Sequence, residues 1–316
     1  MSAAVPSLRP ENTVPAGRVG HRLALGVQWL DAATGLPVTG RLVTDLEALG
    51  SRALAQRFEP HAQGRHAVRW DGRLAKLFVL AAAEKAASPP ATPAADQTNL
   101  LLRVFGGVTP SSGRYLSSND PRRYVPRRLA LTPVQTDGVP PSATDNIRTG
   151  WLWPGANYPL GANATAIRGR IRRGPSLSAA IPVPWARVVV TRPADISAAP
   201  SFATEVQVGW AHGDDRGEFL TVLGAAAVPG GATLPATLPL RLWVFLPPPS
   251  SPDPADPLAG LPLEQAGTDA VGDVLRGIQA PPGYAAQAAL SFPLPTGEVV
   301  RPGRVCVVND SALLFP

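Results

Sequence analysis

Apolar residues recur along this chain in short segments with a period of two, and turns rich in glycine and proline separate the segments. The first clear segment spans residues 22–31, where Leu23, Leu25, Val27 and Trp29 fall on one face. Such alternation is the pattern of a half-buried β-strand. Further segments of this kind follow as far as residue 134, at the short spacing that is typical of a β-sandwich.

The apolar run at residues 74–84, LAKLFVLAAAE, is interpreted as another buried strand. The polar residues 1–20 are interpreted as an extended N-terminal arm and residues 135–146, QTDGVPPSATDN, as a linker. The sequence thus predicts a β-sandwich domain over residues 21–134 and a second β-sandwich domain with a C-terminal extension over residues 147–316.

Composition supports the same fold class. The chain has 316 residues, more than one domain usually contains, and 37 prolines with 30 glycines make long helices improbable. The expected fold is therefore all-β, two tandem β-sandwich domains of Ig-like or transthyretin-like type with proline-rich loops and at most one or two short helices. One helix is expected over residues 263–279, where apolar residues recur three or four apart.

A pattern in the second half carries a family resemblance. Residues 181–190 read IPVPWARVVV, and the segment DDRGEFLTVL follows at residues 214–223. The two segments resemble the carboxypeptidase regulatory-like, transthyretin-like module, a small seven-stranded β-sandwich. Pro182, Val183, Ala186 and Val188 match its strand pair, and Asp215, Gly217 and Phe219 match its hairpin, while Asp214 replaces the usual threonine.

The resemblance covers residues 165–250 and implies a fold and a supporting role, because the matched residues are structural. Asp215 is expected to accept backbone N–H bonds within its turn, and Gly217 is expected to adopt a positive φ. The module is the accessory β-domain of peptidases and does not contain their zinc site. The segment TGLPVTGRLVT near Thr34 is a fainter echo of the pattern.

The formal net charge of +6 comes mostly from arginine. One group comprises Arg122, Arg123, Arg127 and Arg128, and another comprises Arg168, Arg170, Arg172 and Arg173. Both groups are interpreted as solvated strand faces. A nucleic-acid partner would need a basic stripe with stacking aromatic residues or a known module, and the sequence shows neither, which argues against such a partner.

The remaining sequence signals concern location. Cys306, the single cysteine, lies in an apolar strand-like segment and is interpreted as a buried core residue. The N-terminus lacks the pattern of a secretory signal, and no apolar stretch is long enough for a membrane span. A cytoplasmic protein is expected, which could be released by cell lysis within a particle.

A search for chemistry finds no catalytic, cofactor or metal motif. His212, Asp214 and Asp215 could meet a divalent cation, but the segment is more simply a polar loop tip. Acid and base residues need share no local motif, so a hydrolase stays an open, weaker alternative.

Two apolar groups are candidates for ligand or partner contact. Trp151, Trp153 and Tyr158 either pack under a domain edge or form a glycan- or peptide-binding surface. The second group, Leu313, Leu314 and Phe315, is either docked on its own domain or buried by a partner.

The predicted function is that of a non-catalytic structural and interaction protein that needs no cofactor. Its expected partners are other protein subunits, or copies of itself, in an assembly such as a phage-tail-like or contractile injection particle. A glycan- or peptide-binding β-sandwich module is the alternative.

Overall fold

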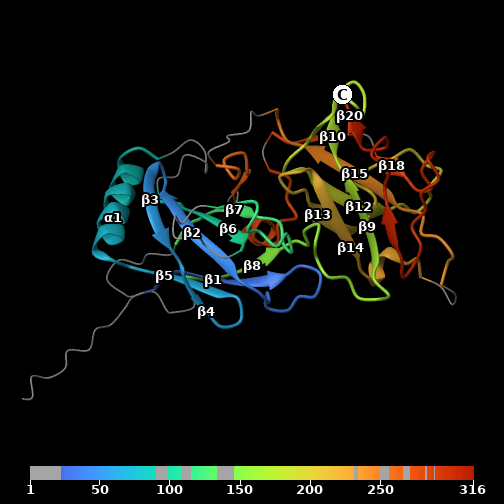
Figure 1. Cartoon of the computed structure of the whole chain (residues 1–316). Helices are drawn as coiled ribbons and strands as arrows, with labels where there is room; N and C mark the ends of the chain where they lie inside the picture. Colours follow the sequence, from blue (N-terminus) through green and yellow to red (C-terminus); the bar gives the residue numbers. More distant parts are fainter. Residues whose placement is uncertain are drawn as a thin grey trace, which may run out of the picture.

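The computed structural model describes residues 23–89, 98–107, 115–133, 146–230, 234–249, 256–265, 271–281, 283–287 and 289–316. The predicted arm, and the predicted linker except Asn146, lie outside these residues. Strands dominate the described chain, which confirms the all-β prediction. Figure 1 shows two groups of sheets beside one another, one mostly blue to green and the other yellow to red.

The N-terminal group contains two sheets. The order in the first is β4 (Glu59–His61), β5 (Arg65–Arg69), β1 (Leu23–Asp31) and β8 (Ile147–Leu152). The order in the second is β16 (Leu263–Gln265), β7 (Arg127–Leu131), β6 (Leu100–Gly106), β2 (Leu42–Leu49) and β3 (Arg52–Arg57). Apolar side chains from both sheets belong to one buried cluster, as expected for a sandwich.

Trp29 is the largest fully buried side chain of this core. Its side chain has no exposed surface, and its indole N–H donates to the Thr44 hydroxyl across a distance of 3.0 Å, from β1 to β2. Gly150 on β8 is paired with Trp29, and a Cβ atom there would lie 2.4 Å from the indole ring. The large ring therefore requires a glycine on the neighbouring strand.

The run at residues 74–84 was predicted to be a strand, and this was wrong, because it forms most of helix α1 (Gly72–Ala87). The Asp71 side chain caps the helix by accepting the Leu74 N–H at 2.6 Å. Leu74, Phe78 and Ala81 are its buried residues, at the spacing of one helix face. Several alanines favour the helix as well.

The C-terminal group contains three sheets around a second core. The strand order in the first sheet is β13 (Val206–His212), β12 (Arg187–Arg192), β15 (Arg241–Leu246) and β17 (Ala285–Ala286), and β18 (Leu290–Ser291) also pairs with β15. The strand order in the second sheet is β14 (Glu218–Leu223), β9 (Thr165–Arg170) and β19 (Val305–Val307). The strand order in the third sheet is β11 (Ile181–Pro182), β10 (Arg172–Arg173) and β20 (Leu314–Phe315). A short 3₁₀ helix, η2, spans Ala225–Ala227.

Two predictions about this group can be compared directly with the structure. Cys306 lies in the second core with its thiol free, as predicted. Gly217 has a φ of +73°, as expected for the turn between β13 and β14. A Cβ atom at Gly217 would also lie 2.5 Å from the carbonyl oxygen of Ile171, so the turn requires glycine for space as well.

The chain passes between the two groups more often than the predicted boundary implied. β8, expected in the second domain, pairs with β1 of the first. After β15 the chain returns to the first group, where β16 pairs in parallel with β7 and α2 (Val271–Arg276) contributes Val274 and Leu275 to its core. The expected helix over residues 263–279 is thus a strand followed by a shorter helix.

We predict that Gly150→Ala destabilises the fold by about 1–3 kcal/mol, because the new methyl group would overlap the Trp29 ring in a closed core. Gly161→Ala is the control, since no heavy atom lies within 4 Å of a Cβ there. Urea unfolding followed by tryptophan fluorescence measures both. Equal stability of the two variants would contradict the packing described for Trp29.

Candidate functional site

A third apolar cluster lies where the two groups of sheets meet. Trp185, just before β12, is 3% exposed and packs with residues from the first group and with the segment that returns to it. The other members of the cluster are Val43, Phe105, Tyr115, Val125, Leu258 and Leu261. The two halves therefore share a continuous apolar contact.

A buried charge cluster lies in the same junction. Glu264 on β16 accepts from Arg127 on β7 through both carboxylate oxygens, at 3.0 and 2.6 Å. Arg187 on β12 donates to the same carboxylate at 3.2 Å. None of the three side chains is more than 3% exposed. One carboxylate thus links the two halves through two guanidinium groups.

Backbone carbonyl groups complete the environment of these charges. Arg127 donates to the carbonyl oxygens of Trp151 at 2.6 Å and Leu275 at 2.9 Å, and also to that of Val274. Arg187 lies 5.9 Å from the ring of Tyr284 and donates to the Trp185 carbonyl at 3.0 Å. The carbonyl dipoles and the ring face offset the excess positive charge of two arginines and one glutamate.

His212 extends the cluster on the C-terminal side. Its Nε2 lies 2.7 Å from the carbonyl oxygen of Gly277, and its ring is fully buried. Burial, followed by the charges of Arg187 and Arg127, holds the pKa of His212 well below its usual value. A neutral imidazole beside two guanidinium groups is suited to packing and is poorly placed to attract a cation.

The expected polar loop tip at residues 212–217 is instead part of the junction. Asp214 is 4% exposed, and its Oδ1 accepts the backbone N–H groups of Arg216 and Glu218, both at 2.9 Å. This is the turn-stabilising role that was assigned to Asp215. Asp215 accepts from the Ser117 hydroxyl at 3.0 Å instead, so it joins the two halves. Across the described residues, no three histidine, cysteine or acidic side chains are grouped to hold a metal ion.

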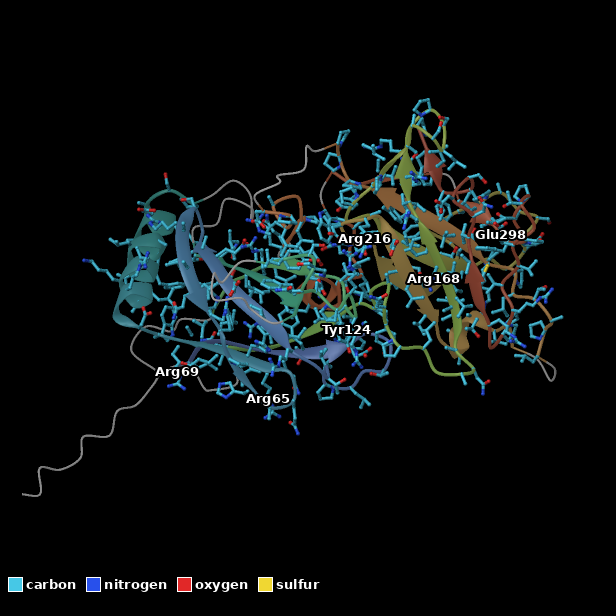
Figure 2. The ribbon with its side chains drawn as sticks, in the orientation of Figure 1. Arg65, Arg69, Tyr124, Arg168, Arg216 and Glu298 are labelled. Carbon is cyan, nitrogen blue, oxygen red and sulfur yellow. The ribbon has the colours of Figure 1, made fainter. Side chains whose placement is uncertain are left out.

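The arginine groups are less solvated than the sequence suggested. Arg127 is fully buried, and Arg122 lies 3.2 Å from Asp214 and 3.5 Å from Asp215 across the junction. Arg168 is exposed, as expected. Figure 2 shows Arg65 and Arg69 on the N-terminal half and Arg168 and Arg216 on the C-terminal half, so basic side chains occur on both.

The predicted aromatic contact residues are partly buried and have partners within the chain. Trp153 donates its indole N–H to the Arg276 carbonyl at 2.8 Å and lies 5.7 Å from the His212 ring. The Tyr158 hydroxyl donates to Asp31 at 2.7 Å. The Trp151 ring lies 6.0 Å from the Arg276 guanidinium. This placement resembles packing under a domain edge, which was one of the two alternatives for these residues, the other being a glycan- or peptide-binding surface.

The C-terminal residues are docked on their own domain, which is the first of the two alternatives expected for them. Leu313 has no exposed surface, and Phe315 is 8% exposed. Leu314 is partly buried on β20, which pairs in parallel with β10. The apolar tail therefore completes the second core.

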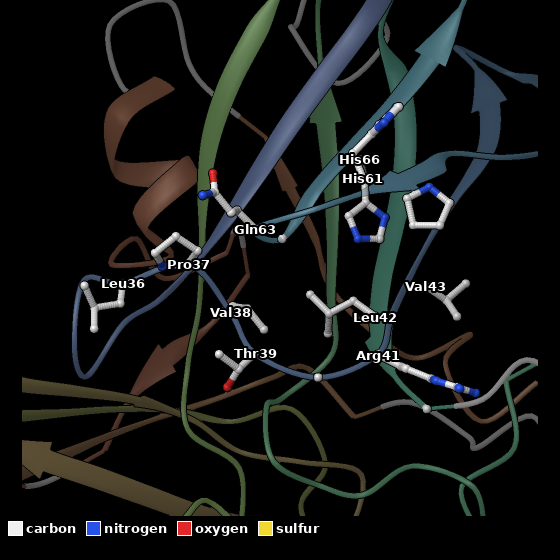
Figure 3. Close-up of a pocket in the computed structure, with 14 residues that line it drawn as sticks. Leu36, Pro37, Val38, Thr39, Arg41, Leu42, Val43, His61, Gln63 and His66 are labelled. Atoms are coloured by element: carbon white, nitrogen blue, oxygen red, sulfur yellow. The ribbon is translucent and has the colours of Figure 1, made fainter.

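A pocket with a volume of about 860 Å³ lies between residues 36–43 and the β4–β5 hairpin. Figure 3 shows Leu36, Pro37 and Val38 on one side of it, with His61 and His66 on another. We call it the hairpin pocket. No motif in the sequence indicated it, because its lining residues are brought together by the pairing of β1 with β5.

Comparisons with known proteins give little guidance. No family model and no curated protein matches the chain. Among solved structures, the Bacillus anthracis TIE protein is similar with 8% identity and a TM-score of 0.21, over 91% of this chain and 33% of that one. The minor pilin GBS52 of Streptococcus agalactiae is similar with 8% identity and a TM-score of 0.20, over 90% and 92%. The chain spans only a third of the TIE protein, and TM-scores this low carry no argument.

We predict that Glu264→Gln lowers the free energy of unfolding by about 3–5 kcal/mol, because it leaves two buried guanidinium groups without a counter-charge. Glu59→Gln is the control, since Glu59 pairs with Arg69 at the surface and such pairs contribute about 0–1 kcal/mol. Chemical denaturation measures both variants. A small effect of Glu264→Gln would show that the buried cluster contributes little to the junction.

We predict a pH-dependent difference between the wild type and Asp214→Asn. Burial, together with the charges of Asp215 and Glu218, raises the pKa of Asp214 from 3.8 to about 7, against the lowering by the backbone N–H of Glu218 and the charge of Arg122. The folded chain thus binds this proton more tightly than the unfolded chain, so the stabilisation is fully present below about pH 4 and is lost as pH rises through 7.

The stability of the wild type relative to Asp214→Asn should therefore fall between pH 4 and pH 8, by at most about 4 kcal/mol. Asparagine keeps the oxygen that accepts the amides of Arg216 and Glu218. Urea unfolding at intervals of one pH unit gives the difference, in which the titration of other groups cancels. A difference that stays constant over this range would mean that Asp214 is ionised throughout.

Proposed function

We propose that the chain is a non-catalytic structural protein whose two halves form one rigid unit for interaction with other protein subunits. The observation that carries this proposal is the junction, in which an apolar cluster and the Arg127–Glu264–Arg187 cluster are both buried. Domains joined by a small polar interface usually move relative to one another. Burial of three charges that satisfy one another holds one relative orientation, since any opening would leave charges unpaired.

The path of the chain supports the same proposal. β8 and β16 each add a strand to a sheet of the first group, and the chain between them forms much of the second group. Separation of the halves would therefore break strand pairing as well as side-chain contacts. A unit of fixed length and orientation is what a component of a large assembly requires.

The more specific proposal is a subunit of a phage-tail-like or contractile injection particle, made in the cytoplasm and released with the particle by lysis. It rests on the resemblance of residues 165–250 to a module that supports other domains. None of the described helices is long and apolar enough to cross a membrane. The partners would be other subunits or further copies of this chain.

The glycan- or peptide-binding alternative depends on Trp151, Trp153 and Tyr158. All three side chains are partly exposed, but the indole N–H of Trp153 and the hydroxyl of Tyr158 already have partners within the chain. Aromatic ring faces would remain for stacking on a ligand. A glycan array with the wild type and a Trp151→Ala variant separates this alternative from the structural role.

We predict that the tagged protein, purified from its native host, sediments in a particle much larger than its 32.9 kDa chain, together with other structural subunits identified by mass spectrometry. Glu264→Gln should reduce its recovery in the particle if a rigid junction is needed, while Glu59→Gln should not. Sedimentation of the wild type as a monomer at native abundance would contradict the proposal.

A further inference from the structure

Helix α1 is apolar on its outer side as well as on the side that packs into the core. Leu74, Phe78 and Ala81 are its buried residues. On the opposite side, Val79 is 59% exposed and Leu80 is 47% exposed. A helix at the surface of a globular protein usually has charged or polar residues there, and a helix that is apolar all round is usually buried. The outer side of α1 therefore has the composition of a covered surface.

The exposed residues of this side form one continuous stripe, which we call the outer face of α1. Its members are related by intervals of three or four positions and so lie side by side along the helix: Lys76, Val79, Leu80, Ala83 and Glu84. Ala83 presents only a methyl group, so another helix can approach closely at this point. Figure 1 shows α1 at the outer edge of the N-terminal group of sheets.

The exposed charges of α1 are distributed unevenly along the helix. Arg73 and Lys76 are exposed in its first half, and Glu84 is exposed in its second half. Glu84 binds Arg52 through Oε1, and its second carboxylate oxygen can accept from a further donor. Lys85, the other charged residue of the second half, is partly buried. The C-terminal end of a helix also attracts cations through its dipole. The second half of the outer face therefore complements the basic first half.

This self-complementarity selects one orientation for a second copy of the helix. Lys76 and Glu84 lie four positions before and four positions after Leu80. In an antiparallel pair of helices with a twofold axis at Leu80, each lysine lies opposite the glutamate of the other copy, and the two leucines meet. A parallel pair would instead place Lys76 beside Lys76. Because one surface carries both partners of the contact, a second copy of this chain is favoured over an unrelated protein.

We propose that the outer face of α1 binds α1 of a second copy of this chain in antiparallel orientation, with Leu80 at the twofold axis and Lys76 paired with Glu84 of the other copy. Val79 and Ala83 complete the apolar contact. The inference rests on the proposed structural role, because it names one contact between subunits. With 16 residues, α1 is about 24 Å long, and a contact of this length buries less than the roughly 1,200 Å² of stable interfaces, so the dimer is weak and reversible.

Sedimentation velocity of the purified full chain at increasing concentration tests the contact. The average mass is expected to rise from 32.9 kDa toward twice that value. Leu80→Glu places two carboxylates at the axis and should raise the dissociation constant by about tenfold or more, which corresponds to about 1.4 kcal/mol. Glutamate favours a helix about as well as leucine does, and circular dichroism checks the fold.

Leu116→Glu is the matched control, because Leu116 is 44% exposed in another part of the chain. This variant should associate as the wild type does. A wild type that stays monomeric, or a Leu80→Glu variant that associates as well as the wild type, would overturn the proposal.

Exchange of the two charges tests the antiparallel arrangement. Lys76→Glu and Glu84→Lys should each weaken self-association by about fivefold, which corresponds to about 0.5 kcal/mol for each of the two symmetric contacts. An equimolar mixture of the two variants restores opposite charges at both contacts, so it should associate about as strongly as the wild type. A mixture that associates no more tightly than either variant alone would refute the antiparallel pairing.

The purified chain also separates this contact from the assembly role. If the pure chain is monomeric but sediments in a particle from its host, the α1 contact is wrong and the assembly role stands. If the pure chain dimerises through α1 but no particle is found in the host, the contact stands and the assembly role is wrong.

Discussion

The carboxylate of Glu264 accepts hydrogen bonds from two guanidinium groups that come from different halves of the molecule. Burial of a charge is unfavourable unless it is paired, so each of these side chains depends on the others. Glu264 can occupy this position only because the chain leaves the second group after β15 and adds β16 to the first. The relative placement of the two halves therefore follows from this one carboxylate together with the strand that carries it.

The buried ion pairs of Glu264 also explain how the short helix α2 and the residues after it are held. Arg127 also binds carbonyl groups near the end of α2, so the short helix is fixed against β7 and β8. Gly277 follows with a φ of +72°, and its carbonyl meets His212. A side chain at Gly277 would lie within 3.0 Å of Trp153, His212 and Arg127, so glycine permits all of these contacts at once. The junction is thus a packed interior and differs from a linker between independent domains.

The hairpin pocket lies beside the junction and is lined by residues 36–43 and by the β4–β5 hairpin. Val43 belongs to both, because it lines the pocket and is a member of the apolar junction cluster. Buried nitrogens without a hydrogen-bond partner occur in both places, at Nε of Arg187 and Nδ1 of His212 in the junction and at Nδ1 of His66 beside the pocket. The junction is therefore well packed without satisfying every one of its polar atoms.

The sequence by itself determined the strand-rich fold class, the position of β1 and the core location of Cys306, because alternating apolar residues and turn residues act locally. The secondary structure of residues 74–84 was predicted wrongly, because a continuous apolar run is compatible with either a buried strand or a helix. The Asp71 side chain, which caps the first turn, favours the helix. It also gave no sign that Arg127 and Glu264 meet, since 137 positions separate them. Only the tertiary structure decided which charges are buried, which sheet receives β8 and β16, and where a pocket forms, because these depend on contacts between segments that are distant in the chain.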